Sequence, residues 1–284
     1  MKTVSTLSCI ALLASCLTVT AFAQSPEQRA QCERTYAPKS GQSGKDVVWV
    51  PTPDHLVTAM LTIGNTTAAD VVYDLGAGDG KIAIAAARDF GARAVGIEYN
   101  EKLVRLAECL VKSSGVADKA KVIHGDIFVN DFSEATVVTM YLLPELNARL
   151  MPTLLKMRPG TRIVSHSFSM GDWKPDDRTV VRGADYIFLW HVPAKAAGNW
   201  TLQASNREPV VLRLEQKYQV LTGTVLDGGK ITPIEEGKLR GSEMTLQYNG
   251  PNGPTTLTGT ITLNQISATA STEQGSTTFA GMRN

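Results

Sequence analysis

A glycine-rich turn, Asp74-Leu75-Gly76-Ala77-Gly78-Asp79-Gly80, decides the fold class because it joins a short apolar run to an alanine-rich run. Residues 71–75 are apolar and β-branched, which predicts a buried strand of a parallel sheet. Residues 81–89 favour a helix. Glycines in such a turn let the backbone approach a ligand at the carboxyl edge of the sheet. We therefore predict a ligand site that includes Gly76, Gly78 and Gly80.

The charges of this turn indicate which kind of ligand it binds. The dinucleotide fingerprint requires Gly or Ala at the position occupied by Lys81. Asp74 and Asp79 also place two carboxylates where a pyrophosphate would lie, and like charges repel. A cationic ligand without phosphates suits the turn better. S-adenosylmethionine, which carries a sulfonium and an ammonium group, is such a ligand.

Two further carboxylates follow the next predicted strands. Glu98 lies at the end of a strand over 94–99, where an acidic residue can accept hydrogen bonds from both hydroxyls of a ribose. Asp126 follows a strand over 121–124, where a carboxylate or backbone group takes an adenine amino group. Each residue alone is also typical of a solvated loop. Their order at successive strand ends favours a nucleoside-type site.

The rest of the first two thirds alternates between strand and helix patterns, which predicts an α/β fold with a parallel sheet covered on both faces. One helix is expected to begin at residues 52–54 and to end at 64–65, and two more are expected over 101–113 and 145–157. Strands are expected over 135–142 and 161–167. Two more runs, 178–182 and 186–192, have little helix between them and predict an antiparallel pair at the sheet edge.

A change of composition predicts a second domain after a linker at 194–198. Residues 199–284 are rich in Thr, Gly, Ser and Gln, and apolar residues recur there with a period of two. Residues 221–225 and 257–261 are near-repeats. We predict a small all-β domain over 198–284, either a meander or a barrel.

The first 23 residues have the layout of a secretory signal peptide, with Lys2, an apolar stretch and small residues before Gln24. This predicts an exported, periplasmic or extracellular protein. The alternatives are a retained membrane anchor and a lipoprotein signal with Cys16 as the lipidated residue. Residues 24–46 are polar and are expected to form a flexible leader before a domain over 47–194.

The cysteines that remain after such a cleavage are Cys32 and Cys109. An exported chain can pair them, but two free thiols are equally consistent with the sequence. The four histidines show no metal-ligand spacing, so no metal site is predicted.

Composition excludes several classes of protein. The chain has 28 basic and 27 acidic residues, and this balance argues against a nucleic-acid binder that neutralises phosphates. Its single long apolar run, at the start, excludes a polytopic membrane protein and predicts no transmembrane span in the mature chain. A serine-hydrolase elbow is absent from the sequence. The oligomeric state has no sequence signal.

Residues 47–193 resemble class I S-adenosylmethionine-dependent methyltransferases. Within that superfamily they are most similar to the protein-lysine methyltransferases that act on the c subunit of the ATP synthase, and to their bacterial relatives. The stretches that carry this resemblance are 50–53, 74–87, 95–100 and Asp172-Trp173. The segment Met140-Tyr141-Leu142-Leu143-Pro144 departs from the pattern of these relatives.

The resemblance implies a Rossmann-like sheet of seven strands and S-adenosylmethionine as the cofactor. It implies that Asp74 and Gly76 contact the methionine end, that Glu98 holds the ribose and that Asp126 holds the adenine. Residues 141–145 would border the methyl group, so Tyr141 or Glu145 is expected to place or deprotonate an acceptor amine.

The resemblance also leaves alternatives open. The acceptor is expected to be a protein lysine, with a small-molecule acceptor or a non-catalytic binding protein as alternatives. Tyr141 is equally consistent with a packed aromatic at a strand end. Trp173 suits either an acceptor channel or the core.

Overall fold

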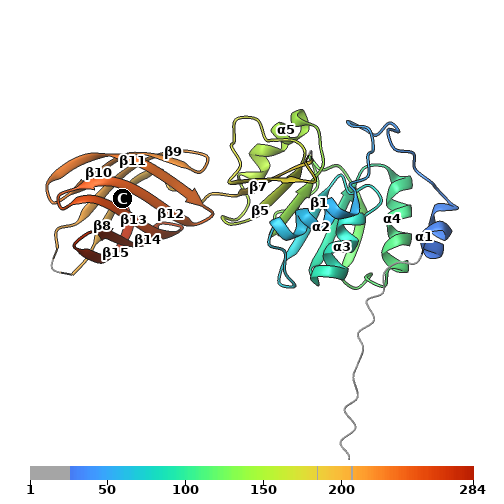
Figure 1. Ribbon diagram of the computed structural model, residues 1–284, viewed down its shortest axis with the longest axis horizontal. Helices are drawn as coiled ribbons and strands as arrows, with labels where there is room; N and C mark the ends of the chain where they lie inside the picture. The colour runs from blue at the N-terminus through green and yellow to red at the C-terminus, as the bar shows by residue number, and fades with distance from the viewer. Residues whose placement is uncertain (1–25, 184, 206) are drawn as a thin grey trace, which may run out of the picture.

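The computed structural model describes residues 26–183, 185–205 and 207–284. An α/β domain and a β-barrel lie side by side along the long axis of the molecule (Figure 1). The predicted signal peptide and the alternative lipidation site at Cys16 lie outside the described residues. Within the described ranges, no helix combines the length and the apolar character that crossing a membrane requires.

The α/β domain is built on the predicted seven-stranded sheet, with strand order β3-β2-β1-β4-β5-β7-β6. The first five strands are parallel, and β7 runs antiparallel to both β5 and β6. The bounds are β1 (Val71–Leu75), β2 (Arg93–Glu98), β3 (Ala120–His124), β4 (Val137–Met140), β5 (Arg162–His166), β6 (Asp177–Val181) and β7 (Asp185–His191).

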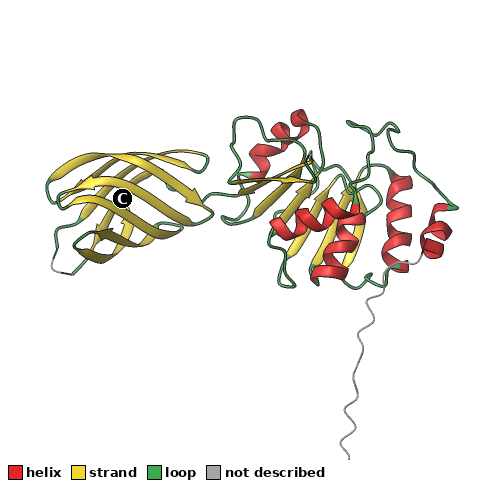
Figure 2. Cartoon of the chain, in the orientation of Figure 1, coloured by secondary structure: helices red, strands yellow, loops and turns green. Residues whose placement is uncertain are grey.

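Helices cover both faces of this sheet because alternate strand residues point to opposite sides. Val72 belongs to the core formed with α2 (Asp54–Ile63), α3 (Lys81–Phe90) and α4 (Glu101–Ser113). Tyr73 belongs to the core on the other face, formed with α5 (Pro144–Leu154). Figure 2 shows the helices arranged around the strands. The α/β fold predicted from the alternating pattern is confirmed.

The described part of the expected flexible leader is instead fixed to the domain. Helix α1 (Pro26–Glu33) packs on α4, and a disulfide joins Cys32 of α1 to Cys109 of α4. The Arg29 guanidinium also pairs with the Asp79 carboxylate at 2.9 Å. Polar composition predicts weak order only where such long-range links are absent.

The C-terminal domain is a closed barrel of eight strands in the described part of the chain, which decides between the two predicted forms. Its interior is filled with apolar side chains, including the fully buried Trp200, Leu246 and Phe279. The strands are β8 (Gly198–Gln203), β9 (Val210–Lys217), β10 (Val220–Asp227), β11 (Lys230–Arg240), β12 (Glu243–Gly250), β13 (Gly253–Thr262), β14 (Gln265–Thr272) and β15 (Gly275–Arg283). Closure removes the free edges that an open sheet would expose.

The barrel contacts the α/β domain through a polar and aromatic joint, which includes the ion pairs of Lys238 with Asp176 and of Arg240 with Asp177. The Tyr218 hydroxyl donates to the Asp172 carboxylate at 2.7 Å, and its ring stacks on Trp173 at 6.0 Å. Trp173 is fully buried and also contacts Trp190, so it is a core residue and not the wall of a channel. His191, which precedes the linker, pairs with the first residue of β5. The barrel is therefore attached at the edge of the sheet opposite the carboxyl ends of the parallel strands.

Candidate functional site

The glycine turn after β1 forms the floor of a pocket at the carboxyl ends of the parallel strands. Gly76 and Gly78 line this pocket. A Cβ atom on Gly78 would lie 2.5 Å from Trp49 Nε1, so only glycine lets the tryptophan cover the turn. Gly80 does not line the pocket. With a φ of 77° it is the residue before α3 and lies against Val122, so its role is to shape the turn.

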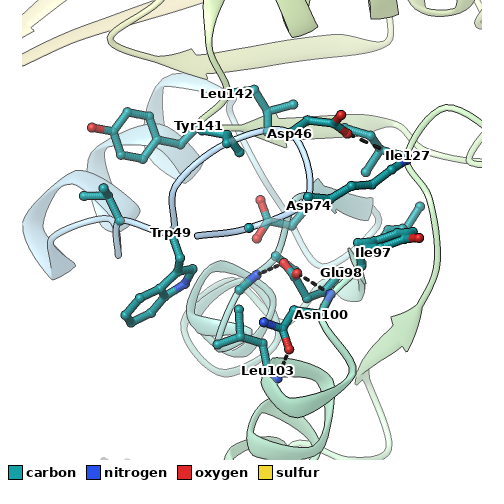
Figure 3. A pocket seen from close by; sticks show the side chains of 18 of the residues that line it. Asp46, Trp49, Asp74, Ile97, Glu98, Asn100, Leu103, Ile127, Tyr141 and Leu142 are labelled. Carbon is teal, nitrogen blue, oxygen red and sulfur yellow. Dashed lines mark hydrogen bonds and ion pairs between the residues drawn. The ribbon is translucent and has the colours of Figure 1, made fainter. Parts of the chain in front are cut away.

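Glu98 links the glycine turn to the start of α4. Its Oε2 accepts a hydrogen bond from Gly78 N at 2.9 Å, and its Oε1 accepts one from Asn100 N at 2.8 Å. Asn100 in turn caps α4 with its side-chain oxygen. Figure 3 shows both bonds to Glu98. Each carboxylate oxygen keeps a second lone pair for a ligand, as the ribose prediction requires.

Asp74 gives the pocket an unusual electrostatic character. The side chain is buried, and Thr139 Oγ1 donates to its Oδ1 at 2.8 Å. Burial raises the pKa of Asp74 to about 7, and the nearby carboxylates of Asp79 and Glu98 contribute to this rise. A cationic ligand would relieve this concentration of negative charge. The pocket therefore fits a ligand that carries a sulfonium or an ammonium.

Asp126 lines the same pocket, as predicted, but it already has a cationic partner. Its Oδ2 accepts a hydrogen bond from Lys45 Nζ at 2.6 Å, and Oδ1 accepts one from Phe128 N. The Lys45 ammonium also lies 4.6 Å from the centre of the Tyr99 ring. This ion pair holds the pKa of Asp126 below its usual value.

Lys45 belongs to a segment that closes the pocket from outside, residues 42–52, which we call the strap. Gln42 and Trp49 pair across it as an isolated antiparallel bridge. All residues of the strap line the pocket. Lys45 lies in the segment expected to be flexible and was not predicted to line a site, because a lone lysine in a polar stretch carries no signal.

The two predicted acceptor-side residues behave differently. Tyr141, directly after β4, lines the pocket, and Figure 3 shows its ring extending away from Asp74. There it contacts the ring of His166, with centroids 3.9 Å apart. Glu145 is exposed on the first turn of α5 and is not among the pocket-lining residues. The structure therefore does not bring Glu145 to the site.

Comparison with known proteins identifies relatives of the α/β domain. A family model described as the ANTKMT methyltransferase domain matches residues 74–177. The protein-lysine N-methyltransferase of Saccharolobus islandicus is 47% identical over 133 residues, which are 46% of this chain and 83% of that protein. The adenine nucleotide translocase lysine N-methyltransferase of Mus musculus is 30% identical over 122 residues. That alignment covers 43% of this chain and 53% of the mouse protein.

A solved methyltransferase structure is also similar to this chain. The crystal structure of an RNA methyltransferase from Salinibacter ruber, in complex with S-adenosyl-L-homocysteine, is 47% identical. It covers 52% of this chain and 96% of that chain, with a TM-score of 0.51. The family model matches residues 74–177 of the α/β domain, which include Asp74, Glu98 and Asp126 of the pocket.

Proposed function

We propose that this chain, which belongs to the S-adenosylmethionine-dependent methyltransferases with an ANTKMT-type domain, methylates the side-chain amine of lysine in a protein. It is a methyltransferase, and S-adenosylmethionine is its cofactor. The observation that carries the choice of lysine is the high identity to the Saccharolobus enzyme over most of that protein's length.

The pocket has residues suited to each part of this cofactor: its methionine end, its ribose and its adenine. Bound S-adenosylmethionine supplies a methyl carbon on a positively charged sulfur. Asp74 and the backbone of Gly76 are assigned to its methionine end, where the negative charge of the pocket is concentrated. Glu98 is assigned to the ribose hydroxyls and Asp126 to the adenine side. The strap, with Lys45 and Trp49, covers the pocket from outside.

The protein contributes mainly alignment to such a transfer. Well-aligned groups supply at most about 7–11 kcal/mol of the barrier. A lysine amine must also lose a proton from a group whose ordinary pKa is about 10.4. Burial raises the pKa of Tyr141, so its phenol stays protonated and neutral at pH 7. We assign Tyr141 to the wall that guides the acceptor toward the cofactor.

A methylation assay tests the choice of acceptor. The purified protein is incubated with labelled S-adenosylmethionine and, separately, a lysine-rich protein, the same protein with its lysines blocked by chemical acetylation, and an RNA. We expect label only on the unmodified protein, at lysines located by mass spectrometry. Label on the RNA, or on the blocked protein, would reject lysine as the acceptor. The formal net charge of +1 gives little attraction to RNA phosphates.

We also propose that the chain is exported, with cleavage after Ala23. The Cys32–Cys109 disulfide supports this proposal because such bonds persist mainly in oxidising compartments. Export would require cofactor outside the compartment where it is made, and the acceptor would then lie in the envelope or beyond it. Cell fractionation with N-terminal sequencing tests the proposal. Protein found only in the cytoplasm with its first residues intact would contradict it.

A further inference from the structure

Three titratable side chains meet beyond the pocket wall formed by Tyr141. His166 ends β5, Asp185 begins β7 and His55 lies in the first turn of α2. His166 Nε2 lies 4.0 Å from Asp185 Oδ1, and His55 Nε2 lies 4.0 Å from Asp185 Oδ2. One carboxylate therefore faces two imidazoles at the same edge of the sheet as the cofactor pocket.

The imidazoles in this group lack the partners that burial normally demands. His166 is 3% exposed, and among the described residues neither of its ring nitrogens has a hydrogen-bond partner. His55 Nε2 is also buried without one in this part of the chain. Leaving such atoms unpaired costs free energy, so native structures rarely do so without a functional reason. The two imidazoles therefore keep hydrogen-bonding capacity that a ligand could use.

The spacing indicates the chemistry of that ligand. A separation of 4.0 Å between His166 Nε2 and Asp185 Oδ1 is too long for a hydrogen bond. A single nitrogen atom between them could lie about 2.9 Å from both His166 Nε2 and Asp185 Oδ1, because two hydrogen bonds of that length together exceed the separation of the two atoms. An alkylammonium has three N–H donors, so it can bond the carboxylate and still place a proton toward the imidazole.

Aromatic rings connect this group to the cofactor pocket. The Tyr141 ring lines the pocket on one side and contacts His166 on the other. Phe168 stacks on Tyr141, with ring centres 6.1 Å apart. Aromatic faces attract ammonium and methylammonium groups. Buried Asn147 donates to the carbonyls of Phe168 and Ser169, and this fixes the turn that follows His166 and carries Phe168.

We propose, resting on the proposed function, that Asp185 binds the acceptor ammonium and that His166 Nε2 removes its proton before methyl transfer. One N–H bond of the ammonium breaks, its electron pair stays on the amine nitrogen, and the proton moves to His166. The neutral amine then moves past the Tyr141 ring to the cofactor, where its electron pair forms the N–C bond as the C–S bond breaks and the C–S electron pair stays on sulfur. A water molecule that replaces the amine carries the proton from His166 to the partly exposed Asp185.

The protonation state of His166 agrees with this role. Burial lowers the pKa of His166, so the ring is neutral at pH 7 and able to accept a proton. The charged or titratable groups that face it are Asp185 from β7, His55 from α2 and Tyr141 after β4. Asp185 favours the protonated ring and His55 opposes it.

Kinetics on matched variants give the first test. We expect His166→Gln to lower kcat about 10²–10⁴-fold at pH 7, with unchanged binding of S-adenosylhomocysteine. The activity of His166→Gln should recover as the pH approaches the pKa of the lysine amine, because the amine then loses its proton without a base. A merely structural defect would not produce this recovery. Asp185→Asn should raise KM for the protein acceptor more than it lowers kcat. His191→Gln is the control, because His191 forms a similar pair with Asp176 at the opposite end of β7.

A binding measurement gives the second test without turnover. The protein is saturated with S-adenosylhomocysteine and titrated with n-butylamine while the ring protons of its four histidines are followed by NMR. We expect saturable shifts of His166 and His55, none of His124 or His191, and loss of these shifts in Asp185→Asn. Shifts that are absent, or that persist in Asp185→Asn, would overturn the amine site.

The two tests separate the inference from the function on which it rests. If the wild-type enzyme methylates lysine and His166→Gln keeps its rate at pH 7, the role of His166 fails and the proposed function stands. If the wild-type enzyme methylates no lysine, the proposed function fails and the proton transfer with it. The n-butylamine titration then decides on the amine site alone.

Discussion

Single residues carry the cofactor chemistry, and Glu98 shows how one carboxylate serves both structure and binding. It accepts backbone hydrogen bonds from Gly78 and Asn100, so it shapes the pocket as well as lining it. We expect Glu98→Ala to raise the Kd for S-adenosylhomocysteine at least about 10-fold, because a hydrogen bond to a charged group contributes about 1.5–3 kcal/mol. Calorimetric titration measures this change.

The control for this prediction is Glu101→Ala, three residues further along. Glu101 is exposed, and its carboxylate pairs with Arg105 on the surface of α4. Its loss should leave the Kd unchanged. Equal Kd values for Glu98→Ala and the wild-type protein, with both folded, would show that Glu98 does not contact the cofactor.

Asp74 makes a second prediction, on pH. Folded Asp74 keeps its proton up to about pH 7, whereas an unfolded Asp loses it near pH 3.9. The folded state therefore binds more protons between these values, and its stability falls as the pH rises from about 4 to 7. In Asp74→Asn this contribution to the fall should disappear. Melting temperatures of both proteins across this range measure the difference.

Ligand binding offers an independent check on Asp74. A cationic cofactor should bind more tightly as the pH rises through 7, because the carboxylate becomes charged. S-adenosylhomocysteine, which lacks the sulfonium, should show a weaker dependence. Parallel pH dependences for the two ligands, or equal melting curves for Asp74→Asn and the wild type, would contradict a raised pKa for Asp74.

Sequence reasoning found the site residues that follow single strands and missed those that depend on contacts between distant segments. Asp74, Glu98 and Asp126 were predictable because the ends of parallel strands meet at one edge of the sheet. His166 and Asp185 were missed because only the antiparallel pairing of β5 and β7 brings them together. Nothing in the surrounding sequence of either residue signals that pairing.

Among the elements, α1 and the strap show that a disulfide can hold a polar segment in a fixed position on the domain. The Cys32–Cys109 disulfide closes a loop of 77 residues. We expect Cys32→Ser with Cys109→Ser to lower the free energy of unfolding by up to about 4 kcal/mol through the entropy of the unfolded chain. Denaturant unfolding of this variant and of the oxidised wild-type protein measures this loss.

The same double variant tests whether α1 supports the strap. If it does, the cofactor should dissociate faster from the variant, because α1, which precedes the strap in the chain, is then no longer joined to α4 by the disulfide. Arg29→Gln is the milder companion, since it keeps the disulfide and removes the ion pair with Asp79. A variant that loses stability but keeps the wild-type dissociation rate would limit the disulfide to a stabilising role.

Element boundaries were less predictable than element types. The fourth strand was expected over 135–142, but β4 spans only Val137–Met140. Tyr141 and Leu142, although apolar or aromatic, leave the strand to line the pocket. A run of apolar residues indicates burial but does not distinguish a strand from the loop that follows it.

At the scale of the whole molecule, the two domains have separate cores. One lies on the two faces of the mixed sheet and the other fills the barrel. The composition change near residue 198 predicted this division. Closure of the barrel was not predictable, because a period of two shows which face of a strand is buried but not whether the first and last strands pair. Here β8 pairs with both β9 and β15.

Separate cores and a barrel attached away from the pocket predict two distinguishable unfolding transitions. Saturating S-adenosylhomocysteine, at about 100 times its Kd, should raise the midpoint of the α/β transition by about 5–10 °C and leave the barrel transition in place. Trp200→Ala, which removes a fully buried ring from the barrel, should cost about 3–5 kcal/mol in the barrel transition alone. Differential scanning calorimetry resolves the two. A single transition that responds to both ligand and substitution would show that the joint, which includes Tyr218 and Trp173, couples the domains. The barrel would then affect the cofactor site through the stability of the α/β domain.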